Sequence, residues 1–291
     1  MSDIRFSMTA PLQRVLVAHA RDCFRSPEWL AAHWREAQFL FEPDYDEACL
    51  ESDRFIAILE DAGASVEIMD ADLCVGLDSL YVHDPVVACG PGLLLGRMGK
   101  ETRQPEVEAM KTKLERLGLQ PTAMQDESAL LEGGDVVWLH PDLVAVGQGF
   151  RTNAAGLNEL IAFCGDSVRE VIPVSLPWWT GYGDVLHIMS LVSPLDEHHL
   201  LIHSRLMPVA FRQRLDEEGF TLLEVPASEY DSLGGNVLSL GNRTCLIEMH
   251  NVQTIRLLED AGFRVLTYSG RHISLAGSGG PTCLTRPLLR G

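Results

Sequence analysis

The sequence has few basic residues for its length. It contains 23 Lys and Arg residues against 41 Asp and Glu residues in 291, which gives a formal net charge of −18. Proteins that bind nucleic acid need a basic face for the phosphates, and no basic cluster stands out along this chain. The deficit of positive charge therefore excludes nucleic acid as an expected partner. The excess of carboxylates indicates a solvated acidic surface.

Long apolar runs are also missing. No window approaches the length that spans a membrane, and residues 1–5 show no basic start followed by an apolar stretch. We therefore expect an unexported, cytoplasmic protein with no membrane partner. The 46% of hydrophobic residues and 22% of charged residues are typical of a globular chain that can bury a sizeable core.

The seven cysteines include no Cys-x-x-Cys pair and have no regular spacing. An odd, irregular set is typical of a reducing compartment, in which cysteines act as small core residues. We expect this of Cys23, Cys49, Cys74, Cys89, Cys164 and Cys245.

Cys283 differs from the other six cysteines. It ends the segment Gly277-Ser278-Gly279-Gly280-Pro281-Thr282-Cys283, which follows a strand-like stretch at residues 272–275. Glycines and a proline let the backbone bend sharply and leave room beside the sulfur. A nucleophilic cysteine needs such a setting, and it also needs a base or a positive charge nearby.

A helix-ending phrase recurs along the chain. Leu-Glu-Asp-Ala-Gly and its variants end at Gly63, Gly118, Gly219 and Gly262, and a weaker fifth copy ends at Gly165. Glycine in this position adopts the left-handed conformation that closes a helix. A short apolar alternation typical of a strand then follows, as at residues 65–68 and 264–267. The sequence therefore predicts five helix-to-strand units.

Each predicted strand is followed by a turn and a further strand pair, which we expect at residues 78–95, 132–147, 183–203, 234–249 and 272–289. Apolar residues at three-to-four spacing predict helices that cover the sheets, at residues 105–117, 152–163, 208–218 and 251–261.

Five such units are best closed as a ring, because one unit cannot bury its own apolar face. Residues 14–17 would add a strand beside the last unit and complete the ring. We expect a single α/β domain over residues 1–291. Residues 25–45 are aromatic and lie outside the repeat, so they are either a lid over one end of the ring or a packed surface extension.

Polar residues recur where each strand pair begins, and in a ring of equivalent units these positions face the axis. A thiol, an imidazole and carboxylates would then meet, which supplies a nucleophile, an acid or base near neutrality, and ligands for a cation. The five units offer residues 78–84, Glu132-Gly133-Gly134-Asp135, residues 184–189 with His187, Gly235-Asn236, and Cys283.

These motifs, together with Phe150-Arg151-Thr152-Asn153, resemble the guanidino-group-modifying enzymes of the pentein superfamily from about residue 78 to the end. That superfamily includes dimethylarginine dimethylaminohydrolases, arginine deiminases and amidinotransferases. The resemblance implies a five-bladed α/β propeller with pseudo-five-fold repeats. It also implies a hydrolase without cofactor or metal that acts on the guanidino group of a small molecule. Its assembly is open, with a homodimer as one alternative.

The resemblance assigns catalytic roles to four residues. Cys283 matches the nucleophile, which attacks the guanidinium carbon and forms a covalent S-alkylthiouronium intermediate. His187 matches the histidine that protonates the leaving amine and then activates water. Asp84 and Glu132 match the carboxylates that bind the guanidinium N–H groups through charge-assisted hydrogen bonds.

Three further residues match substrate ligands in the same family. Arg103 and Arg151 match the residues that bind the α-carboxylate, for which a planar guanidinium is well suited. Asp78 matches a residue near the α-amine.

Two positions bear on the substrate. Arginine deiminases and amidinotransferases carry an aspartate two residues after the histidine, where this chain has Met189. The methylarginine branch usually has a glutamate where this chain has His83. Arginine dihydrolases tend to have asparagine where Asp84 stands, so we expect one C–N cleavage rather than two.

The first hypothesis is that Nω-methylated arginine is converted to citrulline and an alkylamine. An arginine deiminase that releases ammonia and an amidinotransferase are the alternatives within the superfamily. A non-catalytic binding protein on the same propeller is the alternative of a different class.

Overall fold

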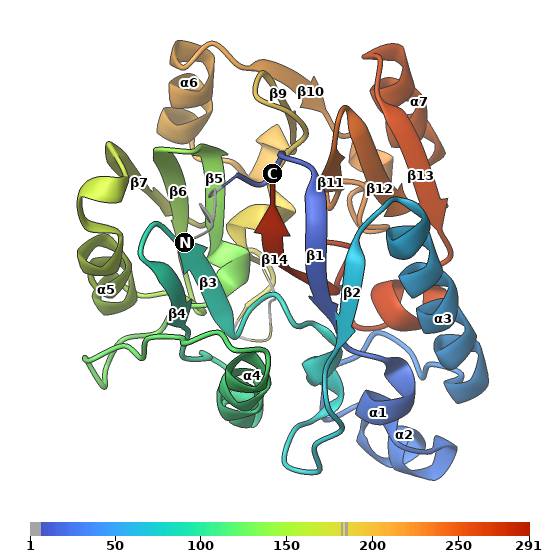
Figure 1. The fold of residues 1–291 in the computed structure, drawn as a ribbon. Helices are drawn as coiled ribbons and strands as arrows, with labels where there is room; N and C mark the ends of the chain where they lie inside the picture. The colour runs from blue at the N-terminus through green and yellow to red at the C-terminus, as the bar shows by residue number, and fades with distance from the viewer. Residues whose placement is uncertain (1–6, 182, 184–185) are drawn as a thin grey trace.

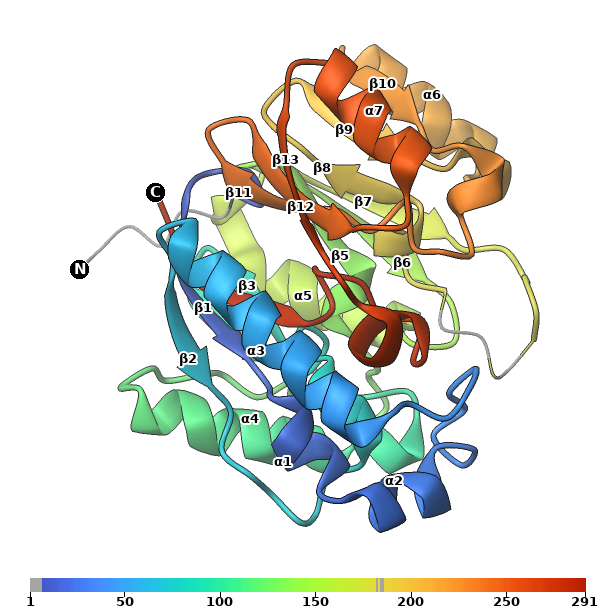
Figure 2. The ribbon, with the colours of Figure 1, turned by 90° about the vertical axis from the view of Figure 1, so that its right-hand side faces the viewer.

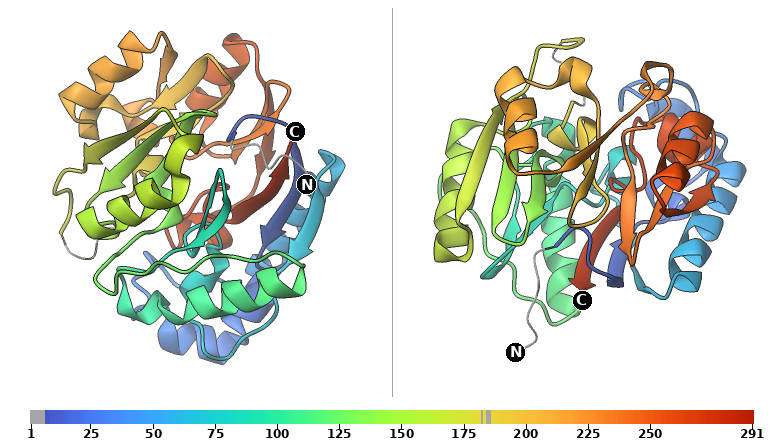
Figure 3. Two further views of the ribbon diagram at one scale, coloured as in Figure 1. Left: turned by 60° about the vertical axis from the view of Figure 1, so that its left-hand side comes forward. Right: turned by 90° about the horizontal axis from the view of Figure 1, so that it is seen from above.

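The structure, a computed structural model, describes residues 7–181, 183 and 186–291 as an α/β fold with five small sheets. Figures 1 and 3 show the sheets toward the middle of the molecule and the longer helices at its periphery. Residues 1–5 and the pair Asp184 and Val185, which the sequence analysis interpreted, lie outside the described residues.

Four of the sheets share one pairing pattern, in which an antiparallel pair is extended by a parallel third strand. In sheet order they are β5 (Val136–His140), β6 (Leu143–Gln148) and β7 (Glu170–Ser175); β8 (Val192–Pro194), β9 (His199–Ile202) and β10 (Thr221–Glu224); β11 (Leu238–Gly241), β12 (Thr244–Glu248) and β13 (Arg264–Tyr268); and β14 (Thr285–Arg290), β1 (Leu12–Val17) and β2 (Ser65–Ile68).

The fifth sheet is the antiparallel pair β3 (Val86–Cys89) and β4 (Gly92–Leu95). Its third strand is reduced to a single parallel bridge between Leu94 and Thr122. The five expected units are thus present as five sheets, and their closure into a propeller stays a prediction.

In each unit a helix lies between the second strand and its parallel neighbour, because a parallel connection must cross over. These helices are α3 (Tyr45–Asp61), α4 (Pro105–Arg116), α5 (Ala154–Cys164), α6 (Val209–Glu217) and α7 (Val252–Asp260). The four predicted helices are confirmed within a few residues. The glycine that follows each helix has a positive φ, as predicted for Gly63, Gly118, Gly165, Gly219 and Gly262.

Helix α5 illustrates how the helices cover the sheets. Leu157 and Leu160 lie on its buried face and belong to the same apolar cluster as Val144 and Val146 of β6. Full burial of such a side chain stabilises the fold by about 1.5–3 kcal/mol.

The stretch at residues 272–275 is not the strand that the sequence predicted. It belongs to a helical turn, Arg271–Leu275, and the last unit has one strand of its own, β14. The buried carboxylate of Glu51 in α3 accepts hydrogen bonds from the backbone N–H groups of Arg271, His272 and Ile273, which fixes the turn. The partner of β14 is β1, as predicted for residues 14–17.

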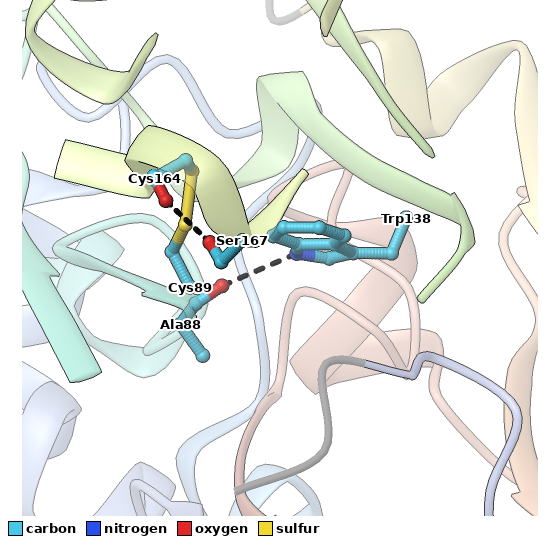
Figure 4. Close-up of a disulfide and its surroundings, with 5 residues drawn as sticks. All are labelled: Ala88, Cys89, Trp138, Cys164 and Ser167. Carbon is cyan, nitrogen blue, oxygen red and sulfur yellow. Dashed lines mark hydrogen bonds between the residues drawn. A yellow bond between two sulfur atoms is a disulfide. The ribbon is translucent and has the colours of Figure 1, made fainter. Parts of the chain in front are cut away.

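Two cysteines that we expected to be free core residues form a disulfide. Cys89 at the end of β3 is bonded to Cys164 at the end of α5, with 5.9 Å between their Cα atoms (Figure 4). Their separation by 75 residues gives no signal in the local sequence. Because disulfides are rare in reducing compartments, the cysteine pattern does not support the predicted location. Cys74 is exposed rather than buried.

Residues 25–45 contain a short helix, α2 (Pro27–His33), that follows α1 (Ala20–Phe24). Phe39 is buried, with its ring 6.1 Å from that of Phe24 and 6.5 Å from that of Tyr81. Leu30 is buried in the same apolar cluster, so the segment is packed onto the core. Among the described residues, no helix is both long and apolar enough to cross a membrane.

Candidate active site

Six of the seven expected site residues line one cavity of about 430 Å³. They are Asp78, Asp84, Arg103, Arg151, His187 and Cys283. The seventh, Glu132, is fully buried and bonded to His187. Residues that are far apart in sequence are thus brought to one place, because they flank strands of four different sheets.

Cys283 lies in the loop before β14. The side chain of Asn236, which lies just before β11, holds this loop in place. The Oδ1 atom of Asn236 accepts a hydrogen bond of 3.1 Å from the backbone N–H of Thr282. The Nδ2 atom donates to the Sγ atom of Cys283 at 3.3 Å. A Cβ at Gly280 would lie 2.5 Å from the Asn236 side chain, so the glycine is needed for this approach. The sequence analysis placed Asn236 near the axis but gave it no role.

His187 is oriented by carboxylates. Its Nε2 atom donates to the Oε2 atom of Glu132 at 2.8 Å, and its Nδ1 atom lies 4.0 Å from the Oδ1 atom of Asp84. A Cβ at Gly134 would lie only 2.5 Å from Nδ1, so the Gly133-Gly134 turn leaves the space that the imidazole occupies. Asp135 fixes the backbone after His187, because its Oδ1 atom accepts from the N–H of Ile188 at 3.1 Å.

Asp84 and Arg103 form a buried ion pair beside His187. The Nη1 atom of Arg103 donates to the Oδ2 atom of Asp84 at 2.7 Å, and the N–H of Gly134 donates to Oδ1. The rest of the Arg103 guanidinium donates to Glu106 and to the carbonyl of Tyr81. Arg103 is therefore held by protein acceptors.

The charges set unusual protonation states at the site. Burial disfavours the imidazolium of His187, but Asp84, Asp135 and the hydrogen bond to Glu132 outweigh it and raise the pKa of His187 to about 9. Burial and then the charge of Asp84 raise the pKa of Cys283 to about 11, although Asn236 opposes this. At neutral pH the site therefore holds a cationic imidazole and a neutral thiol.

Two of the carboxylates beside His187, Asp84 and Glu132, stay ionised, whereas burial raises the pKa of Asp135 to about 7. Burial opposes ionisation of Asp84, but His187 and Arg103 hold the pKa of this carboxyl well below its usual range. The hydrogen bond and the charge of His187 likewise overcome burial and lower the pKa of Glu132. Two ionised carboxylates are thus available beside His187 as acceptors of charge-assisted hydrogen bonds.

A second pair of opposite charges lies in the same cavity. The Nζ atom of Lys100 lies 2.7 Å from the Oδ2 atom of Asp78 and also donates to the carbonyl of Ala37. The sequence analysis named Asp78 and missed Lys100. Lys100 lies three residues before Arg103 in the same loop, and this proximity was the one sequence feature that pointed to it.

The two positions that bear on the substrate lie differently. Met189 lines the cavity, whereas His83 lines a separate cavity. The Nδ1 atom of His83 donates to the carbonyl of Thr285 at 2.8 Å. Burial and the charge of Arg286 lower the pKa of His83 to about 3, so its ring is neutral. The interpretation of His83 as a substrate-specificity residue is therefore not supported.

Asp84, Glu132 and His187 each offer one ligand atom, and these atoms lie within 4.8 Å of one another. This spacing could hold a metal ion. The family resemblance implied an enzyme without a metal. The same three groups are already joined by the hydrogen bond between His187 and Glu132 and by the ion pair of Asp84 with Arg103.

Comparison with known proteins identifies the family. The family model described as arginine deiminase matches residues 78–213 and 207–290 of this chain. The chain belongs to the arginine deiminase family. It is a guanidino-group hydrolase of the pentein type and acts on carbon–nitrogen bonds.

Several relatives cover most of the enzyme. The N(G),N(G)-dimethylarginine dimethylaminohydrolase of Streptomyces coelicolor is 32% identical over 245 residues, which is 81% of this chain and 85% of that protein. A solved dimethylarginine dimethylaminohydrolase from Pseudomonas aeruginosa, in complex with citrulline, has a TM-score of 0.75 at 21% identity and covers 97% of this chain and 100% of its own. The N-terminal domain of a cyanobacterial arginine dihydrolase has a TM-score of 0.79 at 18% identity, with 95% and 98% covered. The two structures share the fold with this enzyme.

Proposed function

We propose that the enzyme hydrolyses Nω-methylated arginine to citrulline and an alkylamine. The observation that carries this proposal is the gathering of the thiol of Cys283, the imidazole of His187 and the carboxylates of Asp84 and Glu132 at one cavity. The identity to the Streptomyces coelicolor enzyme supports the methylated substrate. So does Met189 in the cavity wall, because a thioether suits a methyl group better than a carboxylate would.

The proposed reaction begins with binding of the guanidinium between Asp84 and Glu132. The cation favours the thiolate of Cys283, whose proton is released, and the thiolate attacks the guanidinium carbon. His187 enters the reaction protonated and gives its proton to the leaving alkylamine, so that an S-alkylthiouronium remains on Cys283. The C–N bond breaks as this proton is transferred.

The second half returns the enzyme to its starting state. Neutral His187 takes a proton from water, and the resulting hydroxide attacks the thiouronium carbon. The C–S bond then breaks, the thiolate leaves and takes up a proton from solvent, and citrulline is the product. One water is consumed in each cycle. The oxygen that it adds loses its proton to give the carbonyl of citrulline, and the released amine leaves as the alkylammonium ion.

The amino-acid end of the substrate is proposed to meet the second charge pair. Asp78 binds the α-ammonium, and Arg103 and Arg151 are the proposed ligands of the α-carboxylate. Lys100 adds a cation beside Asp78, so this end of the cavity matches a zwitterion. Arg103 would bind the carboxylate through atoms that now contact Glu106 or Tyr81.

We further propose that the five sheets close as a five-bladed propeller in one domain, and that residues 25–45 act as a lid. Ala37, Gln38 and Leu40 of this segment line the cavity, and Leu40 is 68% exposed. A homodimer and a cytoplasmic location stay proposals.

Incubation with arginine, monomethylarginine and dimethylarginine tests the function. We expect citrulline together with methylamine or dimethylamine, and loss of turnover in Cys283→Ser. Ammonia and citrulline from arginine alone would favour the deiminase alternative, which the matching family model also supports. Transfer to added glycine would indicate amidinotransfer. If no guanidino compound is turned over, the catalytic proposal is wrong.

A further inference from the structure

A second cavity, lined by His83, Thr282, Ser239, Arg286 and Arg290 among others, has a volume of about 50 Å³. None of the described residues lines both this cavity and the substrate cavity. Residues 286–290 of β14 line this cavity. Figure 1 shows β14 near the middle of the molecule, and Figure 2 shows the C-terminus at the molecule's surface. The space holds a few water-sized groups, which is enough for a small ion.

Two arginines of β14 face this cavity. Both Arg286 and Arg290 are among the residues that line it. Arg286 is 8% exposed and Arg290 is 6% exposed. A buried arginine normally has a carboxylate partner, since burial of an unpaired charge is costly.

The other two buried arginines follow that rule. Arg103 pairs with Asp84 and Glu106, and Arg151 lies 3.6 Å from Glu132. No carboxylate among the described residues forms an ion pair with Arg286 or Arg290, in a chain with 41 acidic residues. Among the described residues, none that lines the cavity is acidic.

The guanidinium groups are only partly satisfied by backbone carbonyls. The Nη1 atom of Arg286 donates to the carbonyl of Val86 at 2.9 Å, and that of Arg290 donates to the carbonyls of Ala10 and Ser239 at 2.7 and 3.0 Å. The Nε atom of Arg286 is buried and has no partner in the described part of the chain. Burial lowers the pKa of Arg286 to about 10, although the charge of Asp84 opposes this. Burial together with repulsion from Arg286 lowers the pKa of Arg290 to about 9.

We propose that this cavity is a binding site for a small oxyanion, held by the guanidinium groups of Arg286 and Arg290. A phosphate, sulfate or carboxylate has the charge and the acceptor geometry that two planar guanidinium groups require. Such an anion would supply the missing counter-charge at the centre of the fold. The site is separate from the reaction at Cys283.

Inorganic phosphate is the probe for this site. We expect a saturable rise in melting temperature of the whole protein as phosphate is added at constant ionic strength set with sodium chloride. Sulfate should raise the melting temperature in the same way as phosphate. Acetate tests whether a planar carboxylate also binds, and sodium chloride alone gives the reference melting temperature. Titration calorimetry with phosphate gives the dissociation constant without any substitution.

Variants locate the bound anion. Arg290→Gln should weaken phosphate binding at least about tenfold, because a charge-assisted contact is lost. Arg290→Lys keeps the buried charge and serves if the glutamine variant does not fold; it should weaken binding by a smaller factor. Arg169→Gln, on the surface beside Glu218, is the matched control and should bind as the wild type does.

Arg151→Gln removes a guanidinium from the substrate cavity and should leave phosphate binding intact. The proposal is overturned if phosphate and the other oxyanions have no saturable effect beyond chloride. It is also overturned if binding survives unchanged in both Arg290 variants, or if Arg151→Gln abolishes it, which would place the anion in the substrate cavity.

Discussion

The amide nitrogen of Asn236 donates a hydrogen bond of 3.3 Å to the sulfur of Cys283. The same side chain accepts from the N–H of Thr282, so one residue both positions the loop and favours the thiolate. The bond lowers the pKa of Cys283 against the larger effects of burial and Asp84. Asn236 is therefore a positioning residue for the proposed nucleophile.

Asn236→Ala should lower kcat/KM about tenfold or more, since a hydrogen bond to a charged group is worth about 1.5–3 kcal/mol. The pH midpoint for alkylation of Cys283 by iodoacetamide should rise at the same time. Ser232→Ala, in the loop that precedes Asn236, is the control. An unchanged alkylation midpoint would show that Asn236 has no effect on the thiol.

Cys283 itself should react slowly in the free enzyme at neutral pH. Its pKa is raised, so the thiolate fraction grows only as the pH approaches about 11. A bound guanidinium ligand that leaves the sulfur accessible should move this midpoint to lower pH, because a neighbouring cation favours the anion. Alkylation rates from pH 6 to 11, with and without such a ligand, measure both effects. A midpoint near neutrality in the free enzyme would contradict the prediction.

Glu132→Gln should lower the pKa of His187. The raised value of about 9 depends partly on the hydrogen bond and charge of Glu132, and removal of a carboxylate favours the neutral imidazole. Loss of the protonated acid should reduce kcat by about 10²–10⁴-fold, and the alkaline limb of the pH–rate profile should shift to lower pH. NMR titration of His187 checks the cause. Glu108→Gln, which is exposed on α4, is the control.

The disulfide should contribute measurably to stability. Cys89 and Cys164 close a long loop, so Cys89→Ser with Cys164→Ser should lower the free energy of unfolding by about 2–5 kcal/mol in urea. A reducing agent should destabilise the wild type and leave the double variant unchanged. Thiol counts on the unreduced, unfolded chain test the bond directly: seven reactive thiols rather than five would show that it does not form.

The sequence by itself determined the units of this fold. Helix periodicity, the glycine that ends each helix and the strand that follows it depend on residues within a few positions of one another, and Gly118 and Gly262 adopt the φ that this role requires. The motifs around Glu132, His187 and Cys283 likewise named the residues that meet at the cavity, because equivalent turns in repeated units lie at equivalent places.

Only the tertiary structure decided those features that depend on contacts between residues far apart in the sequence. The turn at Arg271–Leu275 replaced a predicted strand because Glu51, from a helix far earlier in the chain, binds its N–H groups. The disulfide of Cys89, the pairing of Lys100 with Asp78 and the cavity of Arg286 and Arg290 also join segments with no local signature. Local pattern sets which element a segment forms, whereas burial and charge compensation are satisfied only by neighbours that folding brings together.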